Sequence, residues 1–79
     1  MLHTFTIESH HKAHVLYLDE EPLGSYPTVE AAEAGAQRVA DQMQPGASLD
    51  FKLDQGTTLA DFEIRVATLE VNANGSIDR

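Results

Sequence analysis

LHTFTIESHHKAHVLYLD, residues 2–19, shows the fold most clearly, because Phe5 and Ile7 alternate with threonines in its first half and Leu16 and Leu18 recur at every second position in its second half. Alternation with a period of two is typical of a β-strand that is buried on one face. We therefore expect strands at residues 2–8 and 13–19, joined by a polar loop at 9–12. Together they predict an antiparallel hairpin with one side turned to a core.

A loop of four residues would set the pairing of these strands. It places Ile7 opposite His14 and Phe5 opposite Leu16, so the aliphatic and aromatic side chains of both strands share one face. The other face then carries Thr4, Thr6, Val15 and Tyr17.

The next segment predicts a helix. Residues 23–26 can form a short third strand before it, Thr28 is a suitable N-cap, and Pro45-Gly46 ends the helix. Gly35 in its middle indicates close packing, since glycine costs about 1 kcal/mol relative to alanine in a helix. Its apolar stripe has helical spacing and consists of Val29, Ala32, Ala36, Val39, Ala40 and Met43.

Two more strands are expected: residues 48–53, with Leu49, Phe51 and Leu53 facing inward, and residues 61–71, in which Phe62, Ile64 and Val66 share the face opposite to that of Leu69 and Val71. In the second, the alternation slips, which predicts either a bulge near residues 67–68 or a strand end covered on both sides. The fold class is therefore α+β: a two-layer sandwich with one helix on an antiparallel sheet of four to five strands. We expect a single domain at 1–71 and a C-terminal tail at 72–79.

Composition limits the function. The chain has 79 residues, no cysteine and a formal net charge of −8, with thirteen acidic residues against five scattered basic ones. Direct binding to nucleic acid is disfavoured because it needs a positive surface. No apolar run approaches the ~20 residues of a membrane span. A cytoplasmic protein without cofactor is expected.

Two surfaces are candidates for binding a protein partner. The first is an acidic face that suits a basic groove. It runs from an acidic turn expected at residues 19–22 along the exposed side of the helix and comprises Asp19, Glu20, Glu21, Glu30, Glu33 and Asp41. The second is the sheet face opposite the helix, expected to carry Val15, Tyr17, Leu69 and Val71. Two interpretations of that face remain open: the tail covers it, with Ile77 as a plug, or it forms a homodimer or partner interface centred on Tyr17.

The histidines raise the question of a metal site. His10, His11 and His14 are close in sequence, but in a hairpin they do not converge on one point, as zinc ligands must. We expect a polar turn and one partly buried histidine, with no metal. Histidine titration near neutral pH is a third option. Ser9 beside His10 suggests a nucleophile, but no orienting carboxylate is evident from the sequence, so we expect no enzyme.

At Tyr26-Pro27-Thr28-Val29-Glu30-Ala31-Ala32 the chain resembles small uncharacterised bacterial domains that enter a helix in this way. The resemblance spans residues 3–55 and implies a hairpin, a helix and a following strand; that family has no assigned catalytic residues. In size, acidity and lack of cysteine the chain is also similar to phage-encoded inhibitors, including anti-CRISPR proteins. That similarity implies carboxylates placed where a partner would otherwise hold nucleic acid.

The leading hypothesis is thus a non-enzymatic protein-binding module, in its narrower form an inhibitor that docks on a basic nucleic-acid-binding surface. The second is a bacterial housekeeping domain that self-associates through its open sheet face. The third is a small metal binder that uses His10, His11 and His14.

Overall fold

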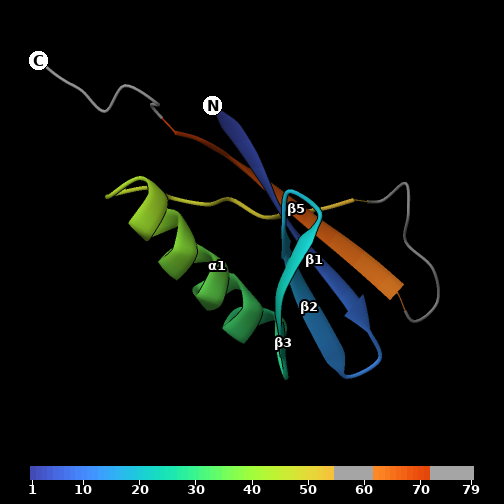
Figure 1. Ribbon diagram of the computed structural model, residues 1–79. Coiled ribbons are helices and arrows are strands. Elements are labelled where there is room, and N and C mark those ends of the chain that lie inside the picture. The colour runs from blue at the N-terminus through green and yellow to red at the C-terminus, as the bar shows by residue number, and fades with distance from the viewer. Residues whose placement is uncertain (55–61, 72–79) are drawn as a thin grey trace, which may run out of the picture.

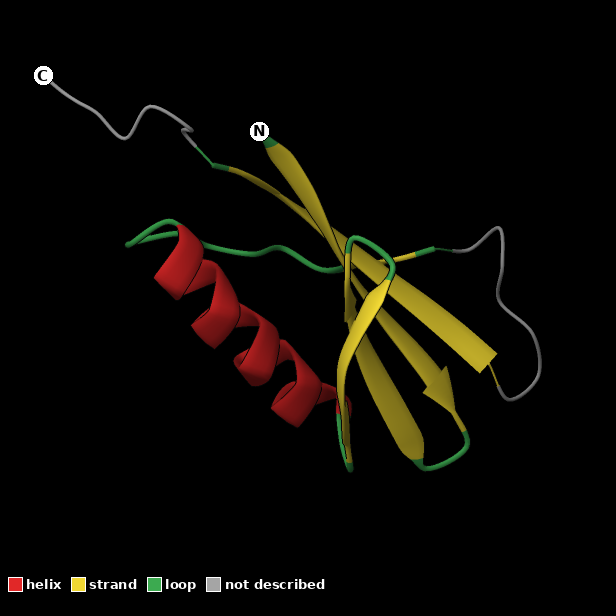
Figure 2. Cartoon of the chain, viewed as in Figure 1, coloured by secondary structure: helices red, strands yellow, loops and turns green. Residues whose placement is uncertain are grey.

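Two layers, a helix and a sheet, make up the computed structural model, which describes residues 1–54 and 62–71 (Figures 1 and 2). In chain order the elements of the described residues are β1 (Leu2–His10), β2 (Ala13–Leu18), β3 (Glu21–Tyr26), α1 (Val29–Met43), β4 (Lys52–Leu53) and β5 (Phe62–Glu70). The sheet order is β3-β2-β1-β5-β4, and every neighbouring pair is antiparallel. The expected α+β class with one helix on an antiparallel sheet is confirmed.

The first hairpin has the expected faces but not the expected pairing. Ile7 lies opposite Leu16, and Phe5 opposite Leu18, so the register is shifted by two residues. The cause is a shorter turn: the strands continue to His10 and Ala13, and only two residues connect them. A shift of two preserves the side-chain alternation, which is why the assignment of faces survives the error.

The second hairpin closes through Asp19 and Glu20, which have φ angles of 51° and 73°. Positive φ at both central residues defines a type I′ turn, whose twist matches that of the flanking strands. β3 therefore begins directly at Glu21, two residues before the expected start. Pairing of β2 with β3 shifts between Leu16 and Tyr17, where the ladder is irregular.

The helix begins where the sequence predicts. Thr28 is the N-cap, and its Oγ1 accepts a hydrogen bond of 3.0 Å from the Ala31 amide. Tyr26 lies over the middle of α1, at Gly35. A Cβ on Gly35 would lie 2.8 Å from Cζ of Tyr26 and closer still to its Oη. Gly35 thus permits close packing of the helix on β3, as expected.

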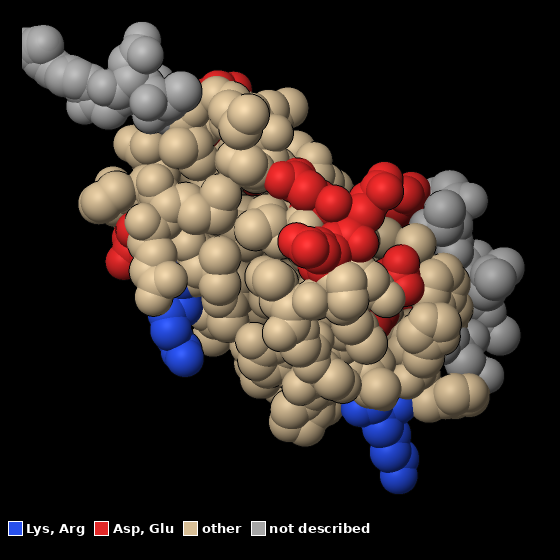
Figure 3. All heavy atoms as spheres, in the orientation of Figure 1, with Lys and Arg blue, Asp and Glu red and all other residues tan. Residues whose placement is uncertain are grey.

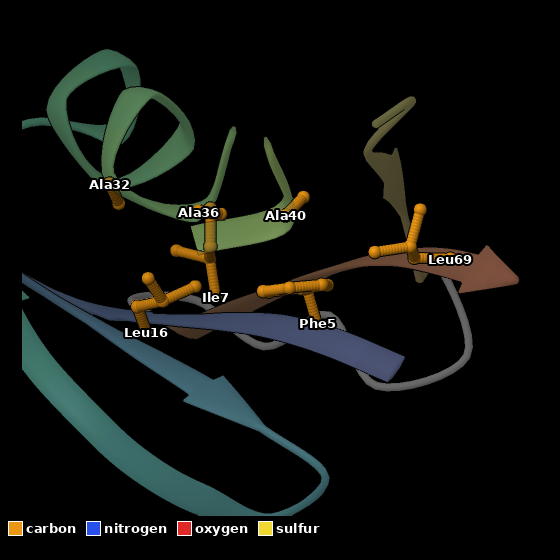
Figure 4. Close-up of a cluster of buried hydrophobic side chains, with 7 residues drawn as sticks. All are labelled: Phe5, Ile7, Leu16, Ala32, Ala36, Ala40 and Leu69. Atoms are coloured by element: carbon orange, nitrogen blue, oxygen red, sulfur yellow. The ribbon is translucent and has the colours of Figure 1, made fainter. Parts of the chain in front are cut away.

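The core lies between α1 and the sheet. Small helical side chains meet large sheet side chains, as Figure 4 shows for the buried cluster Phe5, Ile7, Leu16, Ala32, Ala36, Ala40 and Leu69. Phe5, Ile7 and Leu16 are completely buried. Because alanines hold the helix close to the sheet, these three large residues fill the space between the layers, and burial of each contributes on the order of 2 kcal/mol.

The orientation of β5 differs from the expected one. Its pairing with β1 is continuous from Leu2 opposite Glu70 to His10 opposite Phe62, so the bulge expected near residues 67–68 is absent from this ladder. Ala67 and Leu69 face the helix and are buried. The alternation of β5 therefore starts one residue out of phase with the prediction, and the residues expected inward, Phe62, Ile64 and Val66, face the other way.

The segment after α1 runs back along the helix before it reaches β4 (Figure 1). Gln37 holds it there: its Nε2 donates to the Ala47 carbonyl at 2.5 Å, and its Oε1 accepts from the Leu49 amide at 3.0 Å. Leu49 and Phe51 pack against the core. Consequently the strand expected at 48–53 is reduced to β4, and Leu53, which was expected inward, is 39% exposed.

Candidate functional site

The side of the sheet away from α1 is called the open sheet face here. Its residues alternate with the buried ones on β1, β2 and β5 and comprise Thr4, Thr6, Glu8, Val15, Tyr17, Phe62, Ile64 and Val66. All eight are partly buried, although no described element covers them. They shield one another, which makes the face a continuous surface rather than a set of separate side chains.

The open sheet face has a polar row between two apolar ones. On the central strand, Thr6 lies between Tyr17 and Val66. Glu8 in the same way lies between Val15 and Ile64. A carboxylate between two aliphatic neighbours is an unusual position for a charge, because apolar neighbours reduce its contact with water.

One end of this face is closed by an aromatic pair. The rings of His10 and Phe62 have centroids 4.4 Å apart and are tilted by 40°. His10 Nε2 also lies 3.9 Å from a Glu8 carboxylate oxygen. His10 thus connects the apolar row on β5 to the central carboxylate.

The other end of the open sheet face is acidic. Asp19 and Glu20 line a groove of about 330 Å³ together with Thr4 and Thr6. Glu20 also borders a smaller groove of about 160 Å³ formed with Thr6, Glu8 and Tyr17. Two residues of the predicted acidic face therefore lie beside the predicted sheet surface.

Asp19 is held in place by β1. Its Oδ1 accepts a 2.9 Å hydrogen bond from the Thr4 amide, and its Oδ2 lies 2.6 Å from His3 Nδ1. The bond from the Thr4 amide, followed by the interaction with His3, lowers the pKa of the Asp19 carboxyl below its usual value. The residue is therefore an anion at neutral pH.

The remaining acidic residues do not form one surface with Asp19 and Glu20 in the way the sequence suggested. Glu30 and Glu33 line a groove of about 470 Å³ between α1 and the 47–51 segment, with Asp50 on its other wall. Asp41 Oδ1 accepts a 3.0 Å hydrogen bond from the Gly46 amide, so this carboxylate supports a loop. The helix side expected to be free thus faces the returning chain, while Glu21 is exposed at the start of β3.

The view in Figure 3 shows acidic side chains gathered near the middle of one side, around the β2–β3 turn. Basic side chains project singly at the margins of the same view. On this side the molecule therefore presents a negative centre, in agreement with its charge of −8.

Leu69 and Val71 do not lie on the open sheet face. Leu69 is only 7% exposed and belongs to the core, and Val71 packs against that core from the helix side. Their predicted place is wrong because the phase of β5 is reversed. Val15 and Tyr17 are where they were expected, and their neighbours on β5 are Ile64 and Val66.

The histidines point in different directions. His10 stacks on Phe62 and His11 occupies the exposed tip of the turn with a φ of 51°. His14 faces the helix side, where its Nδ1 lies 2.7 Å from Ser9 Oγ. Within residues 1–54 and 62–71, no three His, Asp or Glu side chains are arranged to hold a metal ion. The metal-binding hypothesis has no geometric support in that part of the chain.

The Ser9–His14 pair was missed at the level of sequence because the expected register placed His14 opposite Ile7. A serine hydroxyl on a histidine nitrogen is also the first requirement of a nucleophilic site. Ser9, however, is only 7% exposed, and neither residue lines the grooves described above. The pair satisfies the hydrogen-bonding needs of a buried hydroxyl.

Sequence reasoning did not place Glu8, Phe62, Ile64 and Val66 on the open sheet face, where they are candidate binding residues. A signal for them existed: β5 carries apolar residues on both faces, which fits a strand with one side in the core and the other at an interface. Among the described residues, no helix is long and apolar enough to cross a membrane. No family model, curated protein or solved structure matches the chain. The two resemblances drawn from the sequence therefore stay predictions.

Proposed function

We propose that the protein is a non-enzymatic binding module whose open sheet face receives a basic protein partner. The observation that carries the proposal is the arrangement of this face: apolar rows on β2 and β5 on either side of Glu8, with Asp19 and Glu20 at one end. The apolar rows provide a surface that a partner can bury, and the carboxylates favour a partner with positive charge. The cytoplasmic location expected from the sequence stays part of this proposal.

The apolar rows supply affinity. Tyr17 is a residue type enriched among the few interface positions that dominate binding energy. Ile64 and Val66 extend the surface across β1, and the Thr6 side chain between the rows is small enough to leave them accessible. A partner that buries these side chains would gain about 25 cal/mol for each Å² of apolar surface removed from water.

The carboxylates favour a basic partner over a second copy of the chain. Burial of Glu8 without a counter-charge would be costly, whereas a lysine or arginine opposite it would form a charge-assisted hydrogen bond. A dimer through this face brings acidic surfaces of two chains with a net charge of −8 together. Charge complementarity also speeds the encounter with a basic surface.

The test is a binding experiment with variants of the open sheet face. Partners are captured from lysate on the immobilised protein, identified, and produced in pure form. Affinity for the purified partner is then measured for Tyr17→Ser, Ile64→Thr and Glu8→Gln. We expect each of the first two to weaken binding at least about tenfold, the order of loss seen when an interface anchor is truncated. Glu8→Gln should reduce the salt dependence of the affinity.

Leu53→Ser is the matched control, since Leu53 is an exposed apolar residue on β4 whose pairing partner Arg65 lies opposite Ile7, on the helix side of the sheet. Equal affinity of all variants would show that the open sheet face is not the binding surface. An acidic partner would contradict the charge argument. A stable dimer in sedimentation equilibrium, abolished by Tyr17→Ser, would replace the proposal by self-association.

The narrower form of the proposal is an inhibitor that covers a nucleic-acid-binding surface of its partner. It requires that the partner's nucleic acid compete with this protein. The double variant Glu30→Gln/Glu33→Gln distinguishes the two acidic surfaces, because these residues line the groove beside α1. If this variant lost binding and Tyr17→Ser had no effect, the interface would lie at the groove beside α1 and not on the open sheet face.

A further inference from the structure

The outer edge of β5 is paired over only part of its length. β4 contacts it through Lys52 opposite Val66 and Leu53 opposite Arg65. β5 continues beyond this contact to Glu70, and its inner edge stays paired with β1 throughout. β5 therefore has one edge that is paired along its whole length and one edge that is unpaired after Val66.

The backbone groups at the open part point outward. The Ile64 carbonyl accepts from the Asp54 amide on the β4 side at 2.7 Å, and the Val71 amide donates to the Met1 carbonyl on the β1 side at 2.8 Å. In an antiparallel ladder the direction alternates along the strand, so the N–H and C=O of Thr68 and Glu70 point away from β1. Within the described part of the chain, these four groups have no backbone partner.

A groove lies beside this edge. It has a volume of about 390 Å³ and is lined by Ser48, Asp50, Lys52, Val66, Ala67 and Thr68. It occupies the place that residues 48–50 would fill if β4 continued along β5. Gln37 prevents this, because its two hydrogen bonds hold Ala47 and Leu49 on the helix.

We propose that this edge is a second binding site, independent of the open sheet face, which takes an extended segment of a partner protein as an added antiparallel strand. A row of unpaired N–H and C=O groups at a sheet edge can pair with the backbone of another extended segment. The edge at β3 is less suited, since it carries Pro22 and an acidic residue at its start, both features of protected edges.

The side chains of the added strand follow from the register. The residue opposite Glu70 should be lysine or arginine, because opposite charges stabilise directly facing pairs. The residue opposite Leu69 points to the helix side and should be apolar, and the one opposite Thr68 should be a small β-former such as threonine. Glu70 already accepts from the Met1 amino group at 2.8 Å, but both side chains are more than half exposed, so that contact competes only weakly.

The experiment uses the full chain and the probe peptide acetyl-Val-Lys-Val-Thr-Val-amide, followed by amide hydrogen exchange with NMR detection. In the free protein we expect the Thr68 and Glu70 amides to exchange at least about 100-fold faster than those of Ala67 and Leu69, which are bonded to β1. Saturation with the probe should slow the Thr68 and Glu70 amides at least about tenfold. Protection of these two amides in the free protein would show that the edge is already occupied and would overturn the proposal.

Two controls test whether the backbone is recognised. A probe N-methylated at its lysine and threonine retains the side chains but cannot pair, and it should not bind. Thr68→Pro removes one outward N–H, a change that an edge strand tolerates. Its affinity for the probe should be at least about tenfold lower than that of Thr68→Val. The proposal would be contradicted if both probes bound equally, or if the unmodified probe did not bind at millimolar concentration. It would also be contradicted if amide exchange slowed with protein concentration and not with added probe.

Discussion

The two faces of the sheet differ in how they are filled. On the helix side, Phe5, Ile7 and Leu16 are completely buried under three alanines. On the open side, Tyr17 and Ile64 are only partly buried, and they lie beside threonines and a glutamate. The first face stabilises the fold, and the second is left available. β1 contributes side chains to both faces, because successive residues of a strand point to opposite sides of the sheet.

Truncation of one isoleucine on each face should produce the largest difference between the two faces. Ile7→Ala should destabilise the protein by about 2–5 kcal/mol, because it leaves a cavity at a fully buried site. Ile64→Ala on the open sheet face should cost about 1 kcal/mol or less, since water can fill the space. Urea unfolding of both variants measures the difference, and equal losses would show that both faces are core.

Close packing on the helix side gives the next test. Gly35→Ala should destabilise by about 1–3 kcal/mol, although alanine is favoured over glycine in a helix by about 1 kcal/mol. The reason is the Tyr26 ring, which occupies the space of the new methyl group. Thermal unfolding of the single variant and of Gly35→Ala with Tyr26→Leu checks this. In the double variant the penalty should be smaller; an unchanged penalty would point to a cause other than the ring.

The sequence predicted the covered face well and the open face poorly. The helix bounds follow from Thr28 and Pro45, and the inward residues of β1 from strict alternation, because each signal is local. The side of β5 that faces the helix could not be predicted, since Phe62, Ile64 and Val66 are more apolar than Glu63 and Arg65 and larger than Ala67, which lie on the helix side in the same part of the strand. Only pairing with β1, a contact distant in sequence, decides which side of β5 is buried.

The same limit applies to the candidate site. Tyr17 could be placed on the open sheet face because its hairpin is local. The role of Gln37 in displacing residues 47–49 from the sheet could not be predicted, because it depends on tertiary hydrogen bonds. The length of β4 and the open edge of β5 follow from those bonds.

The turn at the acidic end of the open sheet face offers a stabilising change. Glu20 has a φ of 73°, a conformation that costs a non-glycine residue about 1–2 kcal/mol. Glu20→Gly should therefore raise the free energy of unfolding by about 1 kcal/mol, because Asp-Gly is a preferred type I′ pair. Denaturant titration measures the gain, and Glu21→Gly is the control, since Glu21 already belongs to a strand. Equal effects of the two changes would contradict the turn assignment.

The smallest expected effect is one of pH. The folded-state pKa of Asp19 lies below its unfolded value, so the ionised carboxylate contributes stability above about pH 4. That contribution is lost as the pH falls through the folded-state pKa. The melting temperature of Asp19→Asn should thus be lower than that of the parent protein at pH 7, and the gap should close towards pH 2.5. A gap independent of pH would mean that ionisation of Asp19 is not involved.

The central position of β1 has a consequence for synthesis on the ribosome. β1 can pair with β2 as soon as the first hairpin has emerged, but its other neighbour begins only at Phe62. Until then, a strand of nine residues that carries Phe5 and Ile7, two of the three largest fully buried side chains in the described residues, has one bare edge. Bare apolar edges recruit other chains. The time needed to translate residues 19–70 therefore sets the interval during which the nascent chain is most prone to aggregate or to require a chaperone.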